Sequence, residues 1–242
     1  YGEMYDPAAG TFTATGSLNQ PRAWPYVLPT ADGKAVVVGG IGYTGAPIAP
    51  TPELYDPQAN TFSKISDDLF PGEPGWTFAT LQSAIDEFRM SDGRYLLMAY
   101  RAVDAKTVYQ LIVFDPTTKT FSKFNTTPGL PDSQTMNWWL PLLNSTKTAA
   151  YIPGYATSDP NQLTLLKVDL TTGKTTMPEV PASKPQSYSF YCSTFSLLKE
   201  GQVMIIGGTS GNNYGALPNT MVLTLTIPES GPTLNIAMYA GI

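Results

Sequence analysis

A pattern of about ten residues occurs five times in this 242-residue chain and constrains its fold more than any other feature. Each copy has a short apolar strand-like segment, a marker position that is usually aspartate, a turn, and a return segment. The marker positions are Asp6, Asp56, Asp115, Asp169 and Ile227, at intervals of 50, 59, 54 and 58 residues. A repeat at this period indicates a chain built from structurally similar units.

The sequence of each copy predicts a β-hairpin. In the first three copies a proline follows the aspartate, and proline ends a strand because it has no N–H to donate to the sheet. Glycine and asparagine tolerate the positive φ that a tight hairpin needs. Four residues after the marker the chain has Gly10, Asn60, Lys119, Gly173 and Gly231. We expect backbone strain at Lys119, the one exception.

A second hairpin is predicted ahead of each of the last four copies. Its turns are expected at Asp32-Gly33, Asp92-Gly93, Asn144-Ser145 and Glu200-Gly201. The apolar runs that follow are 35–38, 95–98, 149–152 and 203–206, two of which end in the glycine pairs Gly39-Gly40 and Gly207-Gly208. Two hairpins per period give four short antiparallel strands, called a to d, and such a unit of about 50 residues is typical of a β-propeller blade.

The composition fits an all-β fold and excludes several kinds of active site. Charged residues are 14% of the chain, against roughly 25% in average proteins. The sequence has no histidine, so imidazole acid–base chemistry, Ser-His-Asp triads and histidine-ligated zinc or copper are excluded for these residues. We expect neither a metal site nor a cofactor.

The period from Pro21 to Ile65 resembles a kelch repeat. It has Asp32-Gly33, an apolar strand that ends in Gly39-Gly40, the Tyr55-Asp56-Pro57 segment and an aromatic residue near its end. The resemblance is looser in the other periods. It implies a single kelch-type propeller segment over 1–242, with full blades at 21–65, 66–125, 130–180 and 181–242 and an outer half blade at 1–18.

The half blade creates an imbalance, because there are five c–d hairpins and only four a–b hairpins. Kelch-type propellers commonly build one blade from both chain ends. We therefore expect the chain to be a segment of a larger propeller. Residues 2–6 should pair with the chain's own C-terminal strand at 234–238, if the last blade lends it, or with a neighbouring subunit.

The d–a connections and the b–c loops of a propeller emerge on one face, which usually binds ligands. Aromatic side chains there could stack on sugars or contact a peptide. They could equally wedge neighbouring blades together. The candidate ligand-binding residues are Arg22, Trp24, Trp76, Trp138 and Tyr188 at the d–a connections, and Tyr43, Arg101, Tyr155 and Tyr214 in the b–c loops.

These features favour a non-catalytic recognition scaffold for protein or glycan ligands. The alternative is part of an extracellular carbohydrate-active oxidase or hydrolase whose catalytic residues lie outside this chain. The copper radical oxidases with kelch-type propellers need two histidine ligands, which are absent here. Carboxylates occur close together at Asp67, Asp68 and Glu73 and at Asp86, Glu87 and Asp92, and we interpret them as solvated loop residues.

Two glycosylation sequons, at Asn125 and Asn144, fall in predicted turns, where both should be exposed. Together with the low charge and the single Cys192, they favour an extracellular or secreted glycoprotein. The net charge of −5 and the absence of a basic cluster argue against nucleic acid as a partner. No apolar run approaches the roughly 20 residues that span a bilayer.

Overall fold

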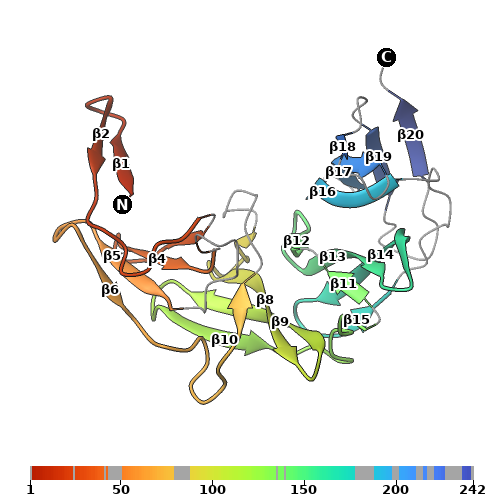
Figure 1. Ribbon diagram of the computed structural model, residues 1–242, viewed down its shortest axis with the longest axis horizontal. Coiled ribbons are helices and arrows are strands. Elements are labelled where there is room, and N and C mark those ends of the chain that lie inside the picture. The colour runs from red at the N-terminus through yellow and green to blue at the C-terminus, as the bar shows by residue number, and fades with distance from the viewer. Residues whose placement is uncertain are drawn as a thin grey trace. The chain divides into compact units, whose positions relative to one another are not determined.

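The computed structural model describes residues 2–23, 25–40, 42, 51–78, 88–134, 136–138, 140–177, 188–197, 202–210, 215–216, 221–226 and 236–240. Side chains are described up to residue 177, except at 136, 137 and 159–163. The elements labelled within these ranges are all β-strands (Figure 1). A helix long and apolar enough to cross a membrane does not occur within these ranges.

The strands form separate antiparallel sheets. The N-terminal hairpin pairs β1 (Glu3–Asp6) with β2 (Thr11–Ala14). The first four-stranded sheet consists of β3 (Tyr26–Pro29), β4 (Ala35–Val38), β5 (Glu53–Asp56) and β6 (Thr61–Lys64) in that order. The second has β7 (Thr77–Phe78), β8 (Tyr95–Val103), β9 (Lys106–Asp115) and β10 (Thr120–Phe124).

Two five-stranded sheets follow. The third sheet runs β11 (Met136–Trp138), β13 (Ala149–Ala156), β14 (Asp159–Asp169) and β15 (Thr175–Thr176), with β12 (Leu142–Leu143) also on β13. The fourth runs β16 (Tyr188–Leu197), β17 (Gln202–Ser210), β19 (Met221–Thr226) and β20 (Ile236–Ala240), with β18 (Gly215–Ala216) also on β17. The all-β prediction is confirmed, with one sheet in each expected segment.

None of the described sheets closes on itself. Contacts between residues divide the chain into two compact units. Unit 1 contains Tyr1–Ala105 and Gln110–Phe124, and unit 2 contains Lys106–Tyr109 and Asn125–Ile242. The N-terminal hairpin and the first sheet therefore belong to unit 1.

The repeated aspartate holds the four described c–d turns together, at Asp6, Asp56, Asp115 and Asp169. Its carboxylate accepts two backbone N–H groups from the turn, as in Asp56, where Gln58 and Ala59 donate at 2.9 and 3.3 Å. Equivalent pairs of bonds occur at Asp6, Asp115 and Asp169. This is the side-chain turn that makes aspartate preferable to other residues at this position.

The position four residues after the marker has the predicted left-handed backbone. Its φ is 66° at Gly10, 53° at Asn60, 60° at Lys119 and 73° at Gly173, whereas Gly231 lies outside the described residues. Lysine in this region is strained, because its Cβ approaches the following carbonyl. The expectation for Lys119 is confirmed.

An aromatic core joins the first and second sheets within unit 1. The ring of Tyr26 lies 5.5 Å from that of Phe78 and 6.4 Å from that of Phe88, and all three side chains are buried. The glycine pair makes this contact possible. Gly39 has a φ of 71°, and a Cβ added there would lie 3.0 Å from Phe78 Cβ. Gly40 has a φ of 95°, and a Cβ added there would lie 2.6 Å from the carbonyl oxygen of Ala23.

The strands of the second and third sheets are longer than the sequence suggested. Arg101 and Tyr155 were expected in b–c loops, but they lie within β8 and β13. The β8–β9 connection is only Asp104-Ala105, with φ of 47° and 62°. An alanine there gives no turn signal, which is why the loop was placed too early.

In the fourth sheet β20 stays paired with β19, so the last sheet keeps its C-terminal strand.

Candidate functional site

The structure describes only some of the predicted ligand-binding residues. Trp24, Tyr43 and Tyr214 lie outside the described residues, and only the backbone of Tyr188, at the start of β16, is described. The other five are Arg22, Trp76 and Arg101 in unit 1 and Trp138 and Tyr155 in unit 2.

Arg22 is buried and bound to protein groups. Its guanidinium lies 2.7 Å from a carboxylate oxygen of Glu53, and neither side chain is more than 1% exposed. It also donates to the carbonyl oxygens of Gly39 and Thr51. These contacts fasten the segment ahead of β3 to β4 and to the residues before β5, which is a structural role.

Glu53 completes this network. One carboxylate oxygen accepts the backbone N–H and the side-chain amide of Asn19 at 2.7 and 2.9 Å, and the other accepts the N–H of Gln20 at 3.1 Å. Burial by itself raises the pKa of Glu53, but the bonds from Asn19 and Gln20 and the Arg22 guanidinium outweigh it. The pKa is therefore below its usual range, and Glu53 is ionised at neutral pH.

Trp138 in unit 2 is 9% exposed, and its indole N–H donates to the carbonyl oxygen of Pro131 at 2.9 Å. Its hydrogen-bonding group is therefore engaged within the protein. Tyr155 is half-buried on β13, opposite Leu163 of β14. The structural alternative considered for the aromatic residues fits Trp138 well.

Trp76 is the centre of a cluster in unit 1, here called the Trp76 cluster, which also contains Phe70, Glu73, Arg101 and Lys123. Trp76 is 4% exposed, with its ring edge-on to Phe70 at 6.1 Å. The guanidinium of Arg101 from β8 lies 4.8 Å from the centre of the indole ring. Lys123 Nζ from β10 lies 5.5 Å from it. Two cations thus contact one aromatic ring system.

Glu73 is the only carboxylate of the Trp76 cluster. It accepts two bonds from Lys123 Nζ at 2.5 and 2.6 Å and one from the Trp76 indole N–H at 3.2 Å. The Lys123 bonds lower the pKa of Glu73 most, followed by the Trp76 bond. Glu73 lies in the loop ahead of β7 with its side chain 40% exposed, and it is also an ionised partner of Lys123. The Glu73–Lys123 contact joins residues 50 positions apart, and no local sequence pattern predicts it.

Arg101 keeps unused hydrogen-bond donors. Its guanidinium approaches Glu73 only to 3.9 Å, and its buried Nε has no hydrogen-bond partner. The side chain is 30% exposed. With one carboxylate and two cations the Trp76 cluster has a net charge of +1 in a chain whose net charge is −5. A partly exposed guanidinium over an aromatic ring suits a carboxylate or another planar anion.

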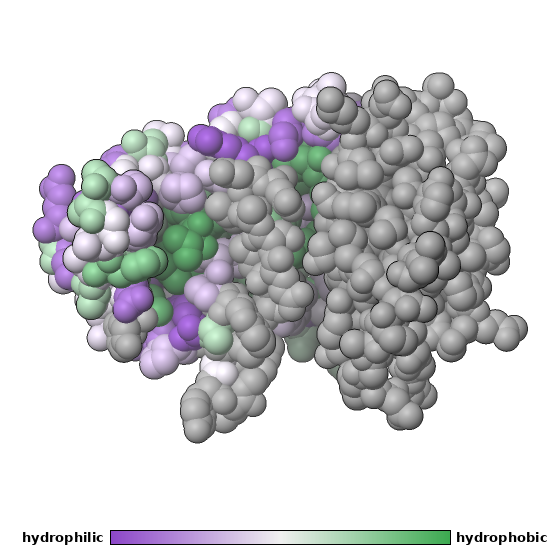
Figure 2. All heavy atoms as spheres, turned by 90° about the horizontal axis from the view of Figure 1, so that it is seen from above, coloured by the Kyte–Doolittle hydropathy of each residue, from purple (hydrophilic) through white to green (hydrophobic). Residues whose placement is uncertain are grey.

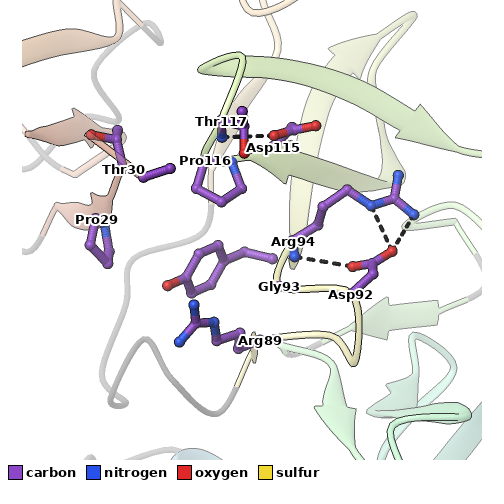
Figure 3. Close-up of a pocket in the computed structure, with 11 residues that line it drawn as sticks. Pro29, Thr30, Arg89, Asp92, Gly93, Arg94, Asp115, Pro116 and Thr117 are labelled. Atoms are coloured by element: carbon purple, nitrogen blue, oxygen red, sulfur yellow. Dashed lines mark hydrogen bonds and ion pairs between the residues drawn. The ribbon is translucent and has the colours of Figure 1, made fainter. Parts of the chain in front are cut away.

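A cavity of about 480 Å³ lies elsewhere in unit 1, and no sequence motif predicted it. Figure 3 shows Pro29 and Thr30 on one side, Arg89 and Arg94 on another, and the Asp115–Thr117 turn above. Arg94 is paired with Asp92, and Asp115 caps its own turn. Arg89 is exposed beside Tyr95 and has no carboxylate partner in the described part of the chain.

The two sequons differ in their surroundings. Asn125 is exposed on the connection between β10 and β11. Asn144 is half-buried, contrary to the expected exposure, and its side chain closes the β12–β13 turn. Its carbonyl oxygen accepts the N–H groups of Thr148 and Ala149, and its amide donates to the Thr146 and Thr148 hydroxyls.

Comparison of the sequence with protein-family models and with curated proteins finds no match in either case. Among the residues described, no group of three or more Cys, Asp or Glu side chains could hold a metal ion. The function is therefore inferred from the side chains of unit 1 and their exposure.

Proposed function

We propose that this chain is a segment of a kelch-type β-propeller that acts as a non-catalytic recognition scaffold for a protein or glycan ligand. The repeated antiparallel sheets of four or five strands and the similar turns at the four described markers support this architecture. The sheets place loops at both ends of every strand, and loops on a rigid scaffold are common binding elements.

The observation that carries the proposal is the state of Arg101. It is the one described candidate with a partly exposed cationic side chain, unfilled donors and a fixed orientation on Trp76. Arg22 and Trp138 are buried and bonded to protein groups. We therefore assign ligand contact to Arg101 and a supporting role to Trp76, Glu73 and Lys123.

The geometry favours a ligand that presents a carboxylate. Arg101 could form a bidentate pair with it, and Lys123 adds a second positive charge near the Trp76 ring. An acidic glycan and an acidic peptide segment share this chemistry. Either one would leave the Glu73–Lys123 contact in place.

The test uses an array of neutral, uronate and sialylated glycans and a matched array of neutral and acidic peptides. The purified chain should bind acidic members of one array, which identifies the ligand class. Arg101→Gln should weaken that binding at least tenfold, whereas Arg89→Gln, the matched control at the cavity of Figure 3, should leave it unchanged. The contact is assigned wrongly if Arg89→Gln alone weakens binding.

The absence of any binding on either array would contradict the scaffold proposal itself. The alternative, part of a carbohydrate-active oxidase or hydrolase, would instead show turnover of a bound glycan once the missing catalytic residues are supplied.

We also propose that the chain is secreted and glycosylated. The exposure of Asn125 supports modification there, while the amide of Asn144 is engaged in its turn. After expression through a eukaryotic secretory pathway, intact-mass measurement should show a glycan that Asn125→Gln removes. A glycan only at Asn144 would contradict this assignment.

A further inference from the structure

The outer edge of β1 is an open strand edge within unit 1. β1 pairs with β2 from Glu3 opposite Ala14 to Asp6 opposite Thr11, and no described residue pairs with its other edge. Met4, Tyr5 and Phe12 are 40%, 52% and 67% exposed. Figure 2 shows hydrophobic side chains among the described residues at this N-terminal end. An open edge beside exposed apolar groups is a typical site for strand addition.

The same hairpin occurs in complete form at β5–β6. Both begin with Glu, an apolar residue, Tyr, Asp and Pro. The Tyr5 and Phe12 rings are 4.9 Å apart at 41°, and the Tyr55 and Phe62 rings are 4.7 Å apart at 36°. The cross-strand register is also the same, with the tyrosine opposite the phenylalanine in each hairpin. β5–β6 therefore shows what a covered β1–β2 would contact.

In the complete sheet, β4 covers the edge of β5 with small apolar residues. Ala35, Val36 and Val37 lie opposite Tyr55, Leu54 and Glu53. Glu53 is 1% exposed and is bonded to Arg22 from the segment ahead of β3. The equivalent Glu3 is exposed and has no ion pair among the described residues. The carboxylate on β1 is thus positioned for a guanidinium.

We propose that the outer edge of β1 binds an antiparallel strand pair of the β3–β4 type, preceded by an arginine that bonds Glu3. Small apolar residues of the inner strand would lie opposite Tyr5, Met4 and Glu3. Pairing between two copies of β1 is disfavoured because it brings two Glu3 carboxylates to one edge. Within its own sheet β20 is paired with β19.

The probe is a labelled synthetic peptide of residues 19–40, which contains Arg22, β3 and β4, added to the intact chain. Binding is measured by fluorescence anisotropy, and hydrogen exchange should show protection of residues 3–6. Glu3→Gln should weaken binding at least tenfold, and Arg22→Gln in the peptide should do the same. The two changes together should cost no more than one, because they remove a single ion pair.

Asp104→Asn is the matched control, since it removes one exposed carboxylate from a turn whose φ of 47° asparagine tolerates. It should leave binding unchanged, as should Arg101→Gln, which separates this proposal from the ligand proposal. Binding that is insensitive to Glu3→Gln, or that leaves residues 3–6 unprotected, overturns the proposal.

A fusion protein tests the same contact without a free peptide, so self-association of the peptide cannot affect the result. A duplicate of residues 19–52 placed directly ahead of Glu3 reproduces the natural connection to Glu53. The fusion should melt at a higher temperature than the parent chain and protect residues 3–6, and Glu3→Gln should reverse both effects. An unchanged melting temperature without protection would refute the assigned occupant.

Discussion

The hairpins β1–β2 and β5–β6 have nearly the same sequence and the same register, but different burial. β5 has Glu53 buried and its other residues half-buried, while every residue of β1 and β2 is exposed. The difference comes from β4 and Arg22, which lie beside β5 only. Local sequence therefore determines the hairpin, and a neighbouring strand determines whether the hairpin contributes to the core.

The comparison also separates two kinds of stabilisation. Bonds within the turn, from the aspartate carboxylate to two N–H groups, are present in both hairpins. The bonds of Glu53 to Asn19, Gln20 and Arg22 join segments more than 30 residues apart in the sequence. Mutations at equivalent positions can measure each kind separately.

The largest difference is expected at the glutamates. Glu53→Gln leaves the buried Arg22 charge without its partner and should lower the free energy of unfolding by about 3–5 kcal/mol. Glu3→Gln, at the exposed equivalent, should change it by less than about 0.5 kcal/mol. Urea denaturation of the two variants checks this. If Glu53→Gln fails to fold, Arg22→Met combined with Glu53→Leu should restore folding, since it removes both charges.

A smaller difference is expected at the phenylalanines. Phe62→Ala should cost about 1–2 kcal/mol, because it removes a half-buried ring and its contact with Tyr55. Phe12→Ala removes the same ring contact from an exposed position and should cost less than about 1 kcal/mol. Equal losses in urea denaturation would mean that β1–β2 is covered in solution.

The sequence predicted the hairpins because their determinants are local. In the four copies whose marker is aspartate, the marker and the residue with positive φ lie four positions apart, so their c–d pairings could be anticipated. The fifth pairing, of β19 with β20, is also present, but its turn lies outside the described residues. The contacts of the candidate site were harder to predict from the sequence. Arg22 bonds to Glu53, and Lys123 bonds to Glu73, across 31 and 50 residues of the chain. A single sequence contains no signal for such distant pairs. Arg101 was among the predicted ligand-binding residues and stays a prediction, and its position within β8 was not foreseen.

The attachment of the first hairpin to the next one depends on Asn60. Its side chain accepts the N–H of Gly16 at 3.0 Å and contacts the carbonyl oxygen of Ala14. Asn60→Gly keeps the positive φ but removes these bonds, so we expect a loss of about 1 kcal/mol and faster hydrogen exchange in residues 2–15. Gly10→Asn, at the equivalent turn with open space around it, should leave exchange unchanged.

The smallest effect concerns Lys34, which lies directly before β4 and contacts the complete hairpin at Asp56. Lys34 Nζ lies 2.7 Å from Asp56, and this bond is the main cause that lowers the pKa of Asp56 below its usual range. A lowered folded-state pKa gives stability that is present above the usual carboxyl range and is lost as pH falls through the lowered value. Lys34→Gln should therefore raise the pKa of Asp56 and flatten the acid limb of the stability curve. NMR titration of the Asp56 carboxyl carbon in the parent chain and in Lys34→Gln measures the shift.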